Sequence, residues 1–216
     1  MSAAGPPASD NPLETVTGWL AEATSAGRQR NPNAMSLATV GDSGQPSARM
    51  VLLKGLDVDA GFAVFYTNYR SRKGLELAHN CHAAAVLYWP EPGRQVRLEG
   101  SVVHSPGEES DTYFATRPAG SQLNAWVSEQ SQTLDEKAGT WQQRLAAKTA
   151  ELGSPDPETG WPRPPFWGGY RLWLRSVELW WEGPDRFHER IHYERNLARH
   201  DDSFKVGPWQ HRRLQP

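Results

Sequence analysis

Two arginines flank a histidine near the carboxyl end of the chain, at positions 186, 188 and 190. In an extended segment, side chains two positions apart lie on the same face, so Arg186, His188 and Arg190 are expected to project to one side. Two permanent cations would then lie beside the one side chain whose ordinary pKa is close to neutral. Such a face suits an anion. The alternative is the solvated face of an amphipathic strand, and the triplet alone does not decide between them.

A second basic cluster, Ser71-Arg72-Lys73, follows an apolar segment and opens a predicted helix. A hydroxyl, two cations and the free amides of a helix amino terminus would converge there, which is chemistry suited to a phosphate monoester. The alternative is simple helix capping with solvated charges.

A third group of donors lies around Arg117, where Tyr113 and Ser121 add hydroxyl groups. Arg49 and Lys54 stand at the two ends of an apolar strand. For that strand, the alternative is a core element whose charged ends reach water. Taken with the other clusters, these donors indicate sites for phosphorylated small molecules.

Other chemistries are not indicated. No Gly-x-Gly-x-x-Gly follows a strand and there is no Walker loop, so the sequence does not predict Rossmann or P-loop nucleotide binding. His79 and His82 have no neighbouring carboxylates or thiols, so we expect surface residues and no metal site. Gln130 and Ser131 offer amide and hydroxyl donors at a helix end, which is uninformative by itself.

Composition favours a soluble globular protein of 216 residues. A net charge of -2 and a pI near 6.4 give no general attraction to nucleic acid or to an anionic membrane. Ten Trp, six Tyr and six Phe argue for a packed core despite a mean hydropathy of -0.69. The single Cys81 excludes an internal disulfide and fits a reducing compartment. With no apolar run of about 20 residues and no secretory signal, we expect a cytoplasmic protein that binds neither membrane nor nucleic acid.

Periodicity and capping residues predict mostly strands. Helices are expected over 11–27, from about 71, over 105–126 and over 135–152, the last one exposed. Strands are expected over 34–40, 47–54, 61–67, 83–89, 95–103, 170–181, 190–194 and 209–214, with a Pro-rich connector over 153–165. Residues 1–10 are expected to form a disordered tail ahead of one domain over 11–216. Without βαβ alternation, the pattern predicts a mainly β antiparallel barrel with peripheral helices.

From about residue 31 to the end, the chain resembles the pyridoxine/pyridoxamine 5′-phosphate oxidase family. The resemblance rests on short motifs in family order and at near-family spacings: RMVLLK at 49–54, FYTN at 65–68, SRK at 71–73, RQV at 94–96, YF at 113–114 with RP at 117–118, SQ at 121–122, WVS at 126–128 with QS at 130–131, FWGGY at 166–170, the Arg-x-His-x-Arg triplet, and RLQP at 213–216. Each motif is weak alone, and their succession is specific.

The resemblance implies a split antiparallel β-barrel of the FMN-binding type, assembled as a homodimer that holds two FMN molecules at the subunit interface. It implies oxidation of pyridoxamine or pyridoxine 5′-phosphate to pyridoxal 5′-phosphate, with electrons passed to O2 and H2O2 released. The implied FMN contacts are Arg49, Met50, Val51, Leu52, Leu53, Lys54, Tyr66, Thr67, Arg72, Lys73, Gln95, Gln130, Ser131, Trp180 and Arg190. The implied substrate contacts are Lys54, Tyr113, Arg117, Ser121, Arg186, Phe187 and His188. Arg186 and His188 are the implied catalytic pair, holding the polar edge of the pyridoxine ring.

The chain departs from the family pattern at one place, and three alternative functions remain open. An Arg-x-x-Tyr segment that often closes over the substrate in the family has no counterpart in residues 1–10. The alternatives are a phenazine-pathway flavin oxidase, a non-catalytic flavin- or pyridoxal-phosphate-binding protein on the same barrel, and a nucleic-acid-binding module, which the acidic pI disfavours.

Overall fold

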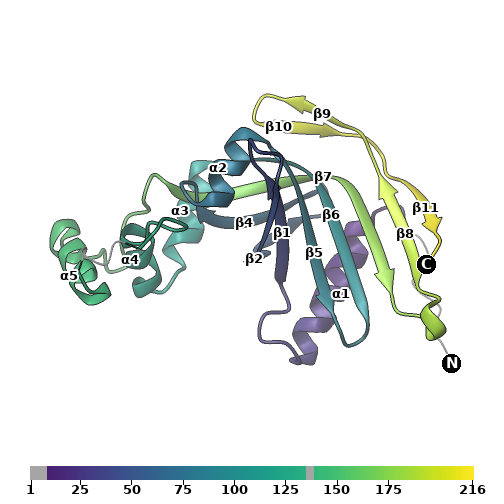
Figure 1. Ribbon diagram of the computed structural model, residues 1–216, viewed down its shortest axis with the longest axis horizontal. Coiled ribbons are helices and arrows are strands. Elements are labelled where there is room, and N and C mark those ends of the chain that lie inside the picture. Colours follow the sequence, from purple (N-terminus) through teal and green to yellow (C-terminus); the bar gives the residue numbers. More distant parts are fainter. Residues whose placement is uncertain (1–8, 135–138) are drawn as a thin grey trace.

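The computed structural model describes residues 9–134 and 139–216, and these fold mainly into β-strands with α-helices around them (Figure 1). The helices are α1 (Pro12–Ala26), α2 (Arg72–His79), α3 (Gly107–Ala115), α4 (Ala119–Val127) and α5 (Trp141–Leu152), and Pro184–Arg186 forms a short 3-10 turn, η2. The strands are β1 (Ala34–Val40), β2 (Pro46–Leu52), β3 (Gly55–Asp57), β4 (Phe62–Asn68), β5 (His82–Trp89), β6 (Arg94–His104), β7 (Trp167–Trp181), β8 (Glu189–Glu194), β9 (Leu197–His200), β10 (Ser203–Val206) and β11 (Gln210–Leu214). In the described ranges, none of the helices combines the length and apolar character needed to cross a membrane.

The antiparallel sheet is organised around its longest strand, β7. One edge of β7 pairs with β6, and the sheet continues from β6 through β5 and β1 to β2. The other edge pairs first with β4 and then with β8, so the sheet divides along this edge. Gly100 lies at a β-bulge between β6 and β7, where an added Cβ would lie 1.8 Å from the carbonyl oxygen of Trp173. Glycine is therefore required at this close crossing, which bends the sheet.

The main core lies between α1 and the sheet. Helix α1 begins where Asn11 accepts a hydrogen bond from the amide of Leu13, and it ends at Gly27, whose φ of 63° is left-handed. Trp19 on its inner face meets Trp89 and Trp181 edge-on, with ring centroids 6.5 and 6.2 Å apart. The high Trp content therefore stabilises helix-on-sheet packing.

Most predicted elements are confirmed within a few residues. The hairpin expected over 34–40 and 47–54 is formed by β1 and β2, with Ala34 opposite Leu52 and Val40 opposite Pro46. Sequence analysis missed β3 and the hairpin of β9 and β10, which are only three or four residues long.

The prediction that Arg186, His188 and Arg190 share one strand face is wrong. Residues 184–186 form a 3-10 turn, and Asp185 and Arg186 have φ angles of 52° and 65°. The strand begins only at residue 189, so Arg190 alone lies on β8. The turn starts at Pro184, directly after Gly183, and the carbonyl of Pro184 accepts a hydrogen bond from the amide of Phe187 at 2.9 Å. A glycine-proline turn thus overrides the period-two pattern.

Two other boundaries differ from prediction. The exposed helix expected from residue 135 begins at Trp141, because Thr140 and Gln143 form a reciprocal capping box. The start of that prediction, 135–138, lies outside the described residues, as do positions 1–8 of the expected tail. The stretch expected to be helical over 105–126 is two helices, α3 and α4, separated at Pro118.

Candidate functional site

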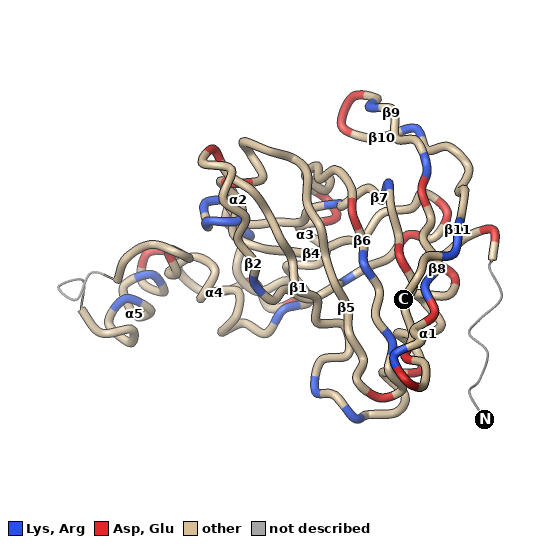
Figure 2. The backbone as a smooth tube through the Cα atoms, turned by 45° about the vertical axis from the view of Figure 1, so that its right-hand side comes forward, with Lys and Arg blue, Asp and Glu red and all other residues tan. Residues whose placement is uncertain are grey.

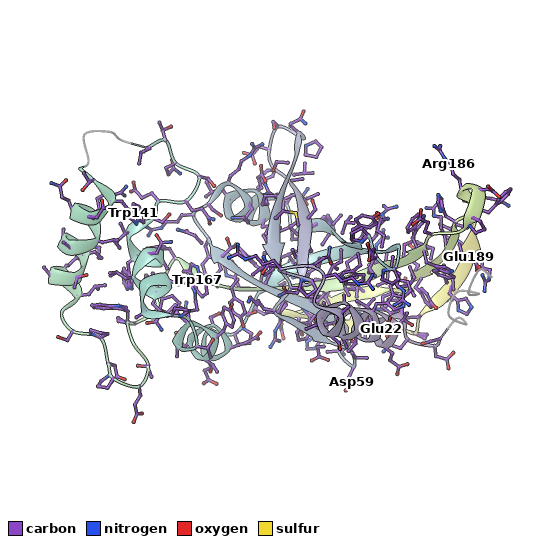
Figure 3. All side chains as sticks on the ribbon, turned by 90° about the horizontal axis from the view of Figure 1, so that it is seen from below. Glu22, Asp59, Trp141, Trp167, Arg186 and Glu189 are labelled. Atoms are coloured by element: carbon purple, nitrogen blue, oxygen red, sulfur yellow. The ribbon has the colours of Figure 1, made fainter. Side chains whose placement is uncertain are left out.

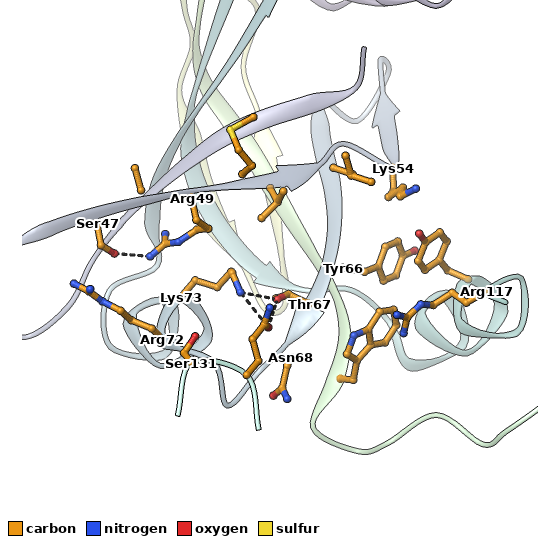
Figure 4. A pocket seen from close by; sticks show the side chains of 17 residues that line it. Ser47, Arg49, Lys54, Tyr66, Thr67, Asn68, Arg72, Lys73, Arg117 and Ser131 are labelled. Atoms are coloured by element: carbon orange, nitrogen blue, oxygen red, sulfur yellow. Dashed lines mark hydrogen bonds between the residues drawn. The ribbon is translucent and has the colours of Figure 1, made fainter. Parts of the chain in front are cut away.

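A cavity of about 610 Å³ lies between β2, β4, the start of α2 and the α3–α4 junction (Figure 4). It is lined by Ser47, Ala48, Arg49, Met50, Val51, Leu52, Lys54, Tyr66, Thr67, Asn68, Arg72, Lys73, Tyr113, Arg117, Gln130, Ser131 and Trp167. Figure 2 shows that basic and acidic residues are interspersed along the chain. The basic groups of this cavity are therefore local clusters, as the composition predicts.

Lys73 is the most buried cation of the cavity, with 6% of its surface exposed. Its Nζ donates to the hydroxyls of Thr67 at 2.9 Å and Ser71 at 3.0 Å, and to Oε1 of Gln130 at 3.2 Å. All three partners are neutral, and among the described residues no carboxylate lies within 4 Å of Nζ. Burial, with repulsion from Arg49, lowers the pKa of Lys73 to about 8. A buried cation without a counter-ion is prepared for an anion.

Ser71 and Lys73 owe their positions to the start of α2. Ser71 occupies the N-cap but makes no capping bond, and its hydroxyl donates to the carbonyl of Asn68 at 2.7 Å. The alternative of simple capping is therefore wrong for this serine. The close packing of the turn requires Gly74, where an added Cβ would lie 2.1 Å from the carbonyl oxygen of Tyr69.

Glu76 organises the other two cations at this end of the cavity. Its carboxylate accepts from Arg72 at 2.8 Å and from Arg49 at 3.0 Å, and the hydroxyls of Thr39 and Ser47 also donate to it. Burial raises the pKa of Glu76, but these donors outweigh burial and hold it at about 2. Three cations and one carboxylate leave a net charge of about +2 below pH 8, which matches a phosphate monoester.

The opposite end of the cavity carries stacked aromatic rings and two further cations. Tyr66 and Tyr113 stack with centroids 3.9 Å apart, and Trp167 lies parallel to both. Nζ of Lys54 lies 5.6 Å from the Tyr113 ring centroid. The Arg117 guanidinium lies 4.4 Å from the Trp167 ring centroid, and its buried Nη1 has no hydrogen-bond partner in the part of the chain that the structure describes. An orphaned buried donor at a cavity wall is a second feature that suits an anion.

Burial, with the nearby Glu109 carboxylate, raises the pKa of Tyr66 to about 12. Its hydroxyl therefore stays protonated at neutral pH and donates to Glu109 at 3.4 Å. Arg171 fixes that carboxylate with two bonds of 3.0 and 2.6 Å. The Glu109–Arg171 ion pair therefore helps to hold Tyr66 in the aromatic stack.

Thirteen of the residues singled out from the sequence line this one cavity: Arg49, Met50, Val51, Leu52, Lys54, Tyr66, Thr67, Arg72, Lys73, Tyr113, Arg117, Gln130 and Ser131. Leu53 and Ser121 were also singled out from the sequence, but they do not line the cavity. Leu53 is buried in the main core, and Ser121 lies in the first turn of α4 with its amide bonded to the carbonyl of Pro118.

The remaining six residues form a separate group at the other end of the sheet: Gln95, Trp180, Arg186, Phe187, His188 and Arg190. Gln95 and Arg190 both pair in register with Trp180, and the Trp180 ring lies 4.7 Å from that of His188. Figure 3 shows Arg186 far along the molecule from Trp167. Within one chain, these six residues do not reach the cavity, whereas Gln130 and Ser131 do.

Sequence reasoning missed five residues around the cavity: Ser47, Ala48, Asn68, Glu76 and Trp167. For Glu76 the available signal was its position four residues after Arg72 on a helix, where opposite charges pair. For Ser47 the signal was its place two residues before Arg49, on the same strand face. Trp167 lies in the motif FWGGY, but its contact with Arg117 had no such signal, because the two residues are distant in sequence.

Comparison with known proteins covers nearly the whole chain. Residues 22–145 match the family model described as pyridoxamine 5′-phosphate oxidase, and residues 167–216 match the pyridoxine 5′-phosphate oxidase C-terminal dimerisation region. The pyridoxine/pyridoxamine 5′-phosphate oxidase of Burkholderia mallei is 48% identical over 206 residues, covering 95% of this chain and 89% of that protein. The Burkholderia thailandensis protein of the same name is 47% identical, with the same coverage.

Solved structures agree on the fold. PhzG from Burkholderia lata, in complex with tetrahydrophenazine-1-carboxylic acid, has a TM-score of 0.81 and 30% identity, covering 100% of this chain and 98% of that chain. A pyridoxamine 5′-phosphate oxidase-related, FMN-binding protein from Nostoc punctiforme has a TM-score of 0.71 and 18% identity, covering 95% and 97%. The predicted split antiparallel barrel with surrounding helices is confirmed.

Proposed function

The chain belongs to the pyridoxamine 5′-phosphate oxidase family, and we propose that it oxidises pyridoxamine 5′-phosphate, pyridoxine 5′-phosphate or both to pyridoxal 5′-phosphate. FMN is the proposed cofactor and O2 the electron acceptor, with H2O2 released. The observation that carries this proposal is one cavity with two separate cationic ends, Lys73 with its arginines and Lys54 with Arg117. Such a cavity suits two phosphorylated molecules held together.

The donor set at the Lys73 end fits the phosphate of FMN. Arg49, Arg72 and Lys73 would hold it, with the Ser131 hydroxyl beside them on the cavity wall. The buried Lys73 bonds only to neutral partners among the described residues, and the phosphate would supply a directly paired anion. FMN, when bound, supplies the two-electron acceptor and the reaction with O2.

The donor set at the aromatic end fits the phosphate of the substrate. Lys54, Tyr113 and Arg117 would bind it, and Ser121 is proposed to join them from the neighbouring helix. The orphaned Nη1 of Arg117 would gain its missing acceptor. Anchoring the phosphate fixes the distance of the pyridoxine ring from the FMN end of the cavity, which is the positioning that this chemistry requires.

A second copy of the chain would complete the site. The matched dimerisation region contains Trp180, Arg186, His188 and Arg190, which lie in the separate group. In the proposed homodimer, Arg186 and His188 of one subunit orient the ring held in the cavity of the other. His188 can then exchange a proton with the ring's phenolic oxygen. Arg190, held by Glu178 through bonds of 3.0 and 3.1 Å, would contact the flavin.

A phenazine-type flavin oxidase is the second candidate, because PhzG has a similar fold across the whole chain. The cations Lys54 and Arg117 favour a phosphorylated substrate over an unphosphorylated phenazine precursor. A non-catalytic flavin-binding protein is the third candidate, since the fold alone does not specify catalysis.

The test is an aerobic assay with added FMN that measures pyridoxal 5′-phosphate and H2O2 from each phosphorylated substrate, with tetrahydrophenazine-1-carboxylic acid as the competing substrate. Equal amounts of both products from a phosphorylated substrate are expected. Turnover of the phenazine compound alone would favour the second candidate. A flavin that pyridoxamine 5′-phosphate does not bleach under anaerobic conditions would favour the third.

A further inference from the structure

Arg117 is held in the cavity by aromatic rings, and within residues 9–134 and 139–216 no polar side chain bonds to its guanidinium. Its guanidinium carbon lies 4.4 Å from the Trp167 ring centroid and 5.3 Å from that of Phe114. Among the described residues, no carboxylate lies within 4 Å of it. The buried Nη1 likewise has no hydrogen-bond partner in the described ranges. The position of this cation therefore depends on what it stacks against (Figure 4).

Trp167 is itself rigidly placed. It opens β7 opposite Asn68, is 7% exposed, and its carbonyl accepts from Nη1 of Arg163 at 2.7 Å. Its ring meets Phe114 edge-on, with centroids 5.1 Å apart. Trp167 can therefore serve as a fixed surface against which the Arg117 cation rests.

The next residue along β7 explains how Arg117 reaches this surface. An added Cβ at Gly168 would lie 2.1 Å from Oη of Tyr69 and 3.0 Å from Oγ of Ser110 on α3. Glycine at this position lets α3 pack directly on the strand. The end of α3 with Tyr113, and Arg117 two residues beyond the helix, are thereby brought over the Trp167 ring.

We propose that Trp167 is a positioning residue that holds Arg117 ready for the substrate phosphate, and so sets the preference for phosphorylated over unphosphorylated ligands. This inference rests on the proposed function. Stacking orients the planar guanidinium and reduces the freedom it must lose on binding, without occupying the N–H groups that the phosphate needs. An ion pair with a protein carboxylate would hold Arg117 equally well but would compete with the phosphate.

The test uses FMN-loaded protein and two probes that cannot be oxidised at C4′, 4′-deoxypyridoxine 5′-phosphate and 4′-deoxypyridoxine. Their dissociation constants are measured from the change in flavin absorbance, and the ratio of the two constants is the readout. A general structural defect moves both constants, whereas loss of Arg117 positioning moves only the phosphorylated probe. The ratio is measured for wild type, W167L, W167F, R117A and the W167L/R117A double variant. W173L is the matched control, because Trp173 is a buried tryptophan on the same strand that does not line the cavity.

W167L is expected to reduce the preference ratio by about 3- to 30-fold, the range of a cation–π contact. W167F, which keeps a ring, is expected to stay within about threefold of wild type. W173L leaves the ratio unchanged, and the double variant matches R117A, because Trp167 acts through Arg117. If W167L does not yield folded protein, W167M takes its place and gives the same shift.

Two results overturn the inference while leaving the proposed function standing. One is a wild-type ratio in W167L or W167M, and the other is a double variant in which the two separate losses add in full. A wild-type protein with no preference for the phosphorylated probe is a different pattern. It overturns the proposed function, and the inference with it.

Discussion

Lys73→Met is predicted to stabilise the apoprotein and to weaken FMN binding at the same time. The lowering of the Lys73 pKa from 10.5 to about 8 corresponds to a cost of about 3 kcal/mol for keeping the charge buried. Methionine removes that charge and fills similar space. It also removes the bonds to Thr67, Ser71 and Gln130. Two of these three acceptors are hydroxyls, which can rotate toward other partners. The free energy of unfolding of the apoprotein at pH 7 should therefore rise by about 1–3 kcal/mol.

The same charge gives a pH dependence whose sign can be worked out. The folded apoprotein releases the Lys73 proton near pH 8, whereas the unfolded chain keeps it to about 10.5. Between these values the unfolded state binds more protons, so this residue makes apoprotein stability rise with pH across that window. K73M should lack the rise. FMN binding has the opposite trend, because the phosphate favours the protonated amine: affinity should fall as the pH rises above about 8.

Urea unfolding of the apoprotein at pH 7 and pH 10, together with FMN titration by fluorescence quenching, measures both effects. One lost charge-assisted bond contributes about 1.5–3 kcal/mol, so K73M should weaken FMN by about 10- to 100-fold. K205M, at an exposed lysine on β10, is the control and should change neither quantity. A destabilised K73M apoprotein with wild-type FMN affinity would refute the reasoning.

Three further predictions concern other charged groups. Glu76→Gln should lower the free energy of unfolding at pH 7 by about 2–3 kcal/mol in urea titrations, because the Glu76 pKa of about 2 in place of 4.5 stabilises the folded state. This stabilisation is complete above pH 4.5 and is lost as the pH falls toward 2, so an acid-unfolding curve that E76Q leaves unchanged would contradict the prediction. Arg195→Met should cost about 1–3 kcal/mol by thermal or urea unfolding, because it leaves the buried carbonyl of Leu174 without the Arg195 donor and that of Gly61 with the Leu174 amide alone, and an unaltered midpoint would count against this. His188→Ala should keep FMN and the dimer but lower kcat/KM for pyridoxamine 5′-phosphate by roughly one to four orders of magnitude, whereas wild-type kinetics would assign His188 to the solvated surface.

The sequence predicts the cavity side of the site well, because its residues lie in short local patterns. Arg49 lies on β2 with Lys54 two residues beyond its end, and Arg72 and Lys73 lie at one helix start, so each short segment carries its own cations to the cavity wall. The thirteen lining residues named in advance follow from such patterns and from the family motifs. Helix spacing contains the Arg72–Glu76 pair, but local patterns do not contain the contact of Glu76 with Arg49 or that of Trp167 with Arg117, since both cross elements that only the fold brings together.

The failure at residues 184–188 has a different cause. Alternation of Arg, x, His, x and Arg predicts a strand, but Gly183-Pro184 starts a turn whose left-handed residues, Asp185 and Arg186, break the alternation. A period-two pattern of three residues is too short to outweigh turn-forming residues directly before it. The six separate residues lie at the far end of the sheet within one chain, so only the proposed dimer would bring them to a cavity.

A complementation assay tests the central claim, that this is a pyridoxal 5′-phosphate-forming oxidase whose site combines the cavity of one subunit with the Arg186–His188 group of another. R117A damages the cavity and H188A damages the other group, so each homodimer has two defective sites. In a co-expressed equal mixture, half of the dimers are mixed, and each of these has one site built entirely from unaltered residues. Pyridoxal 5′-phosphate formation should therefore recover to about one quarter of the wild-type rate per subunit. A mixture whose rate equals the average of the two single variants would contradict the account.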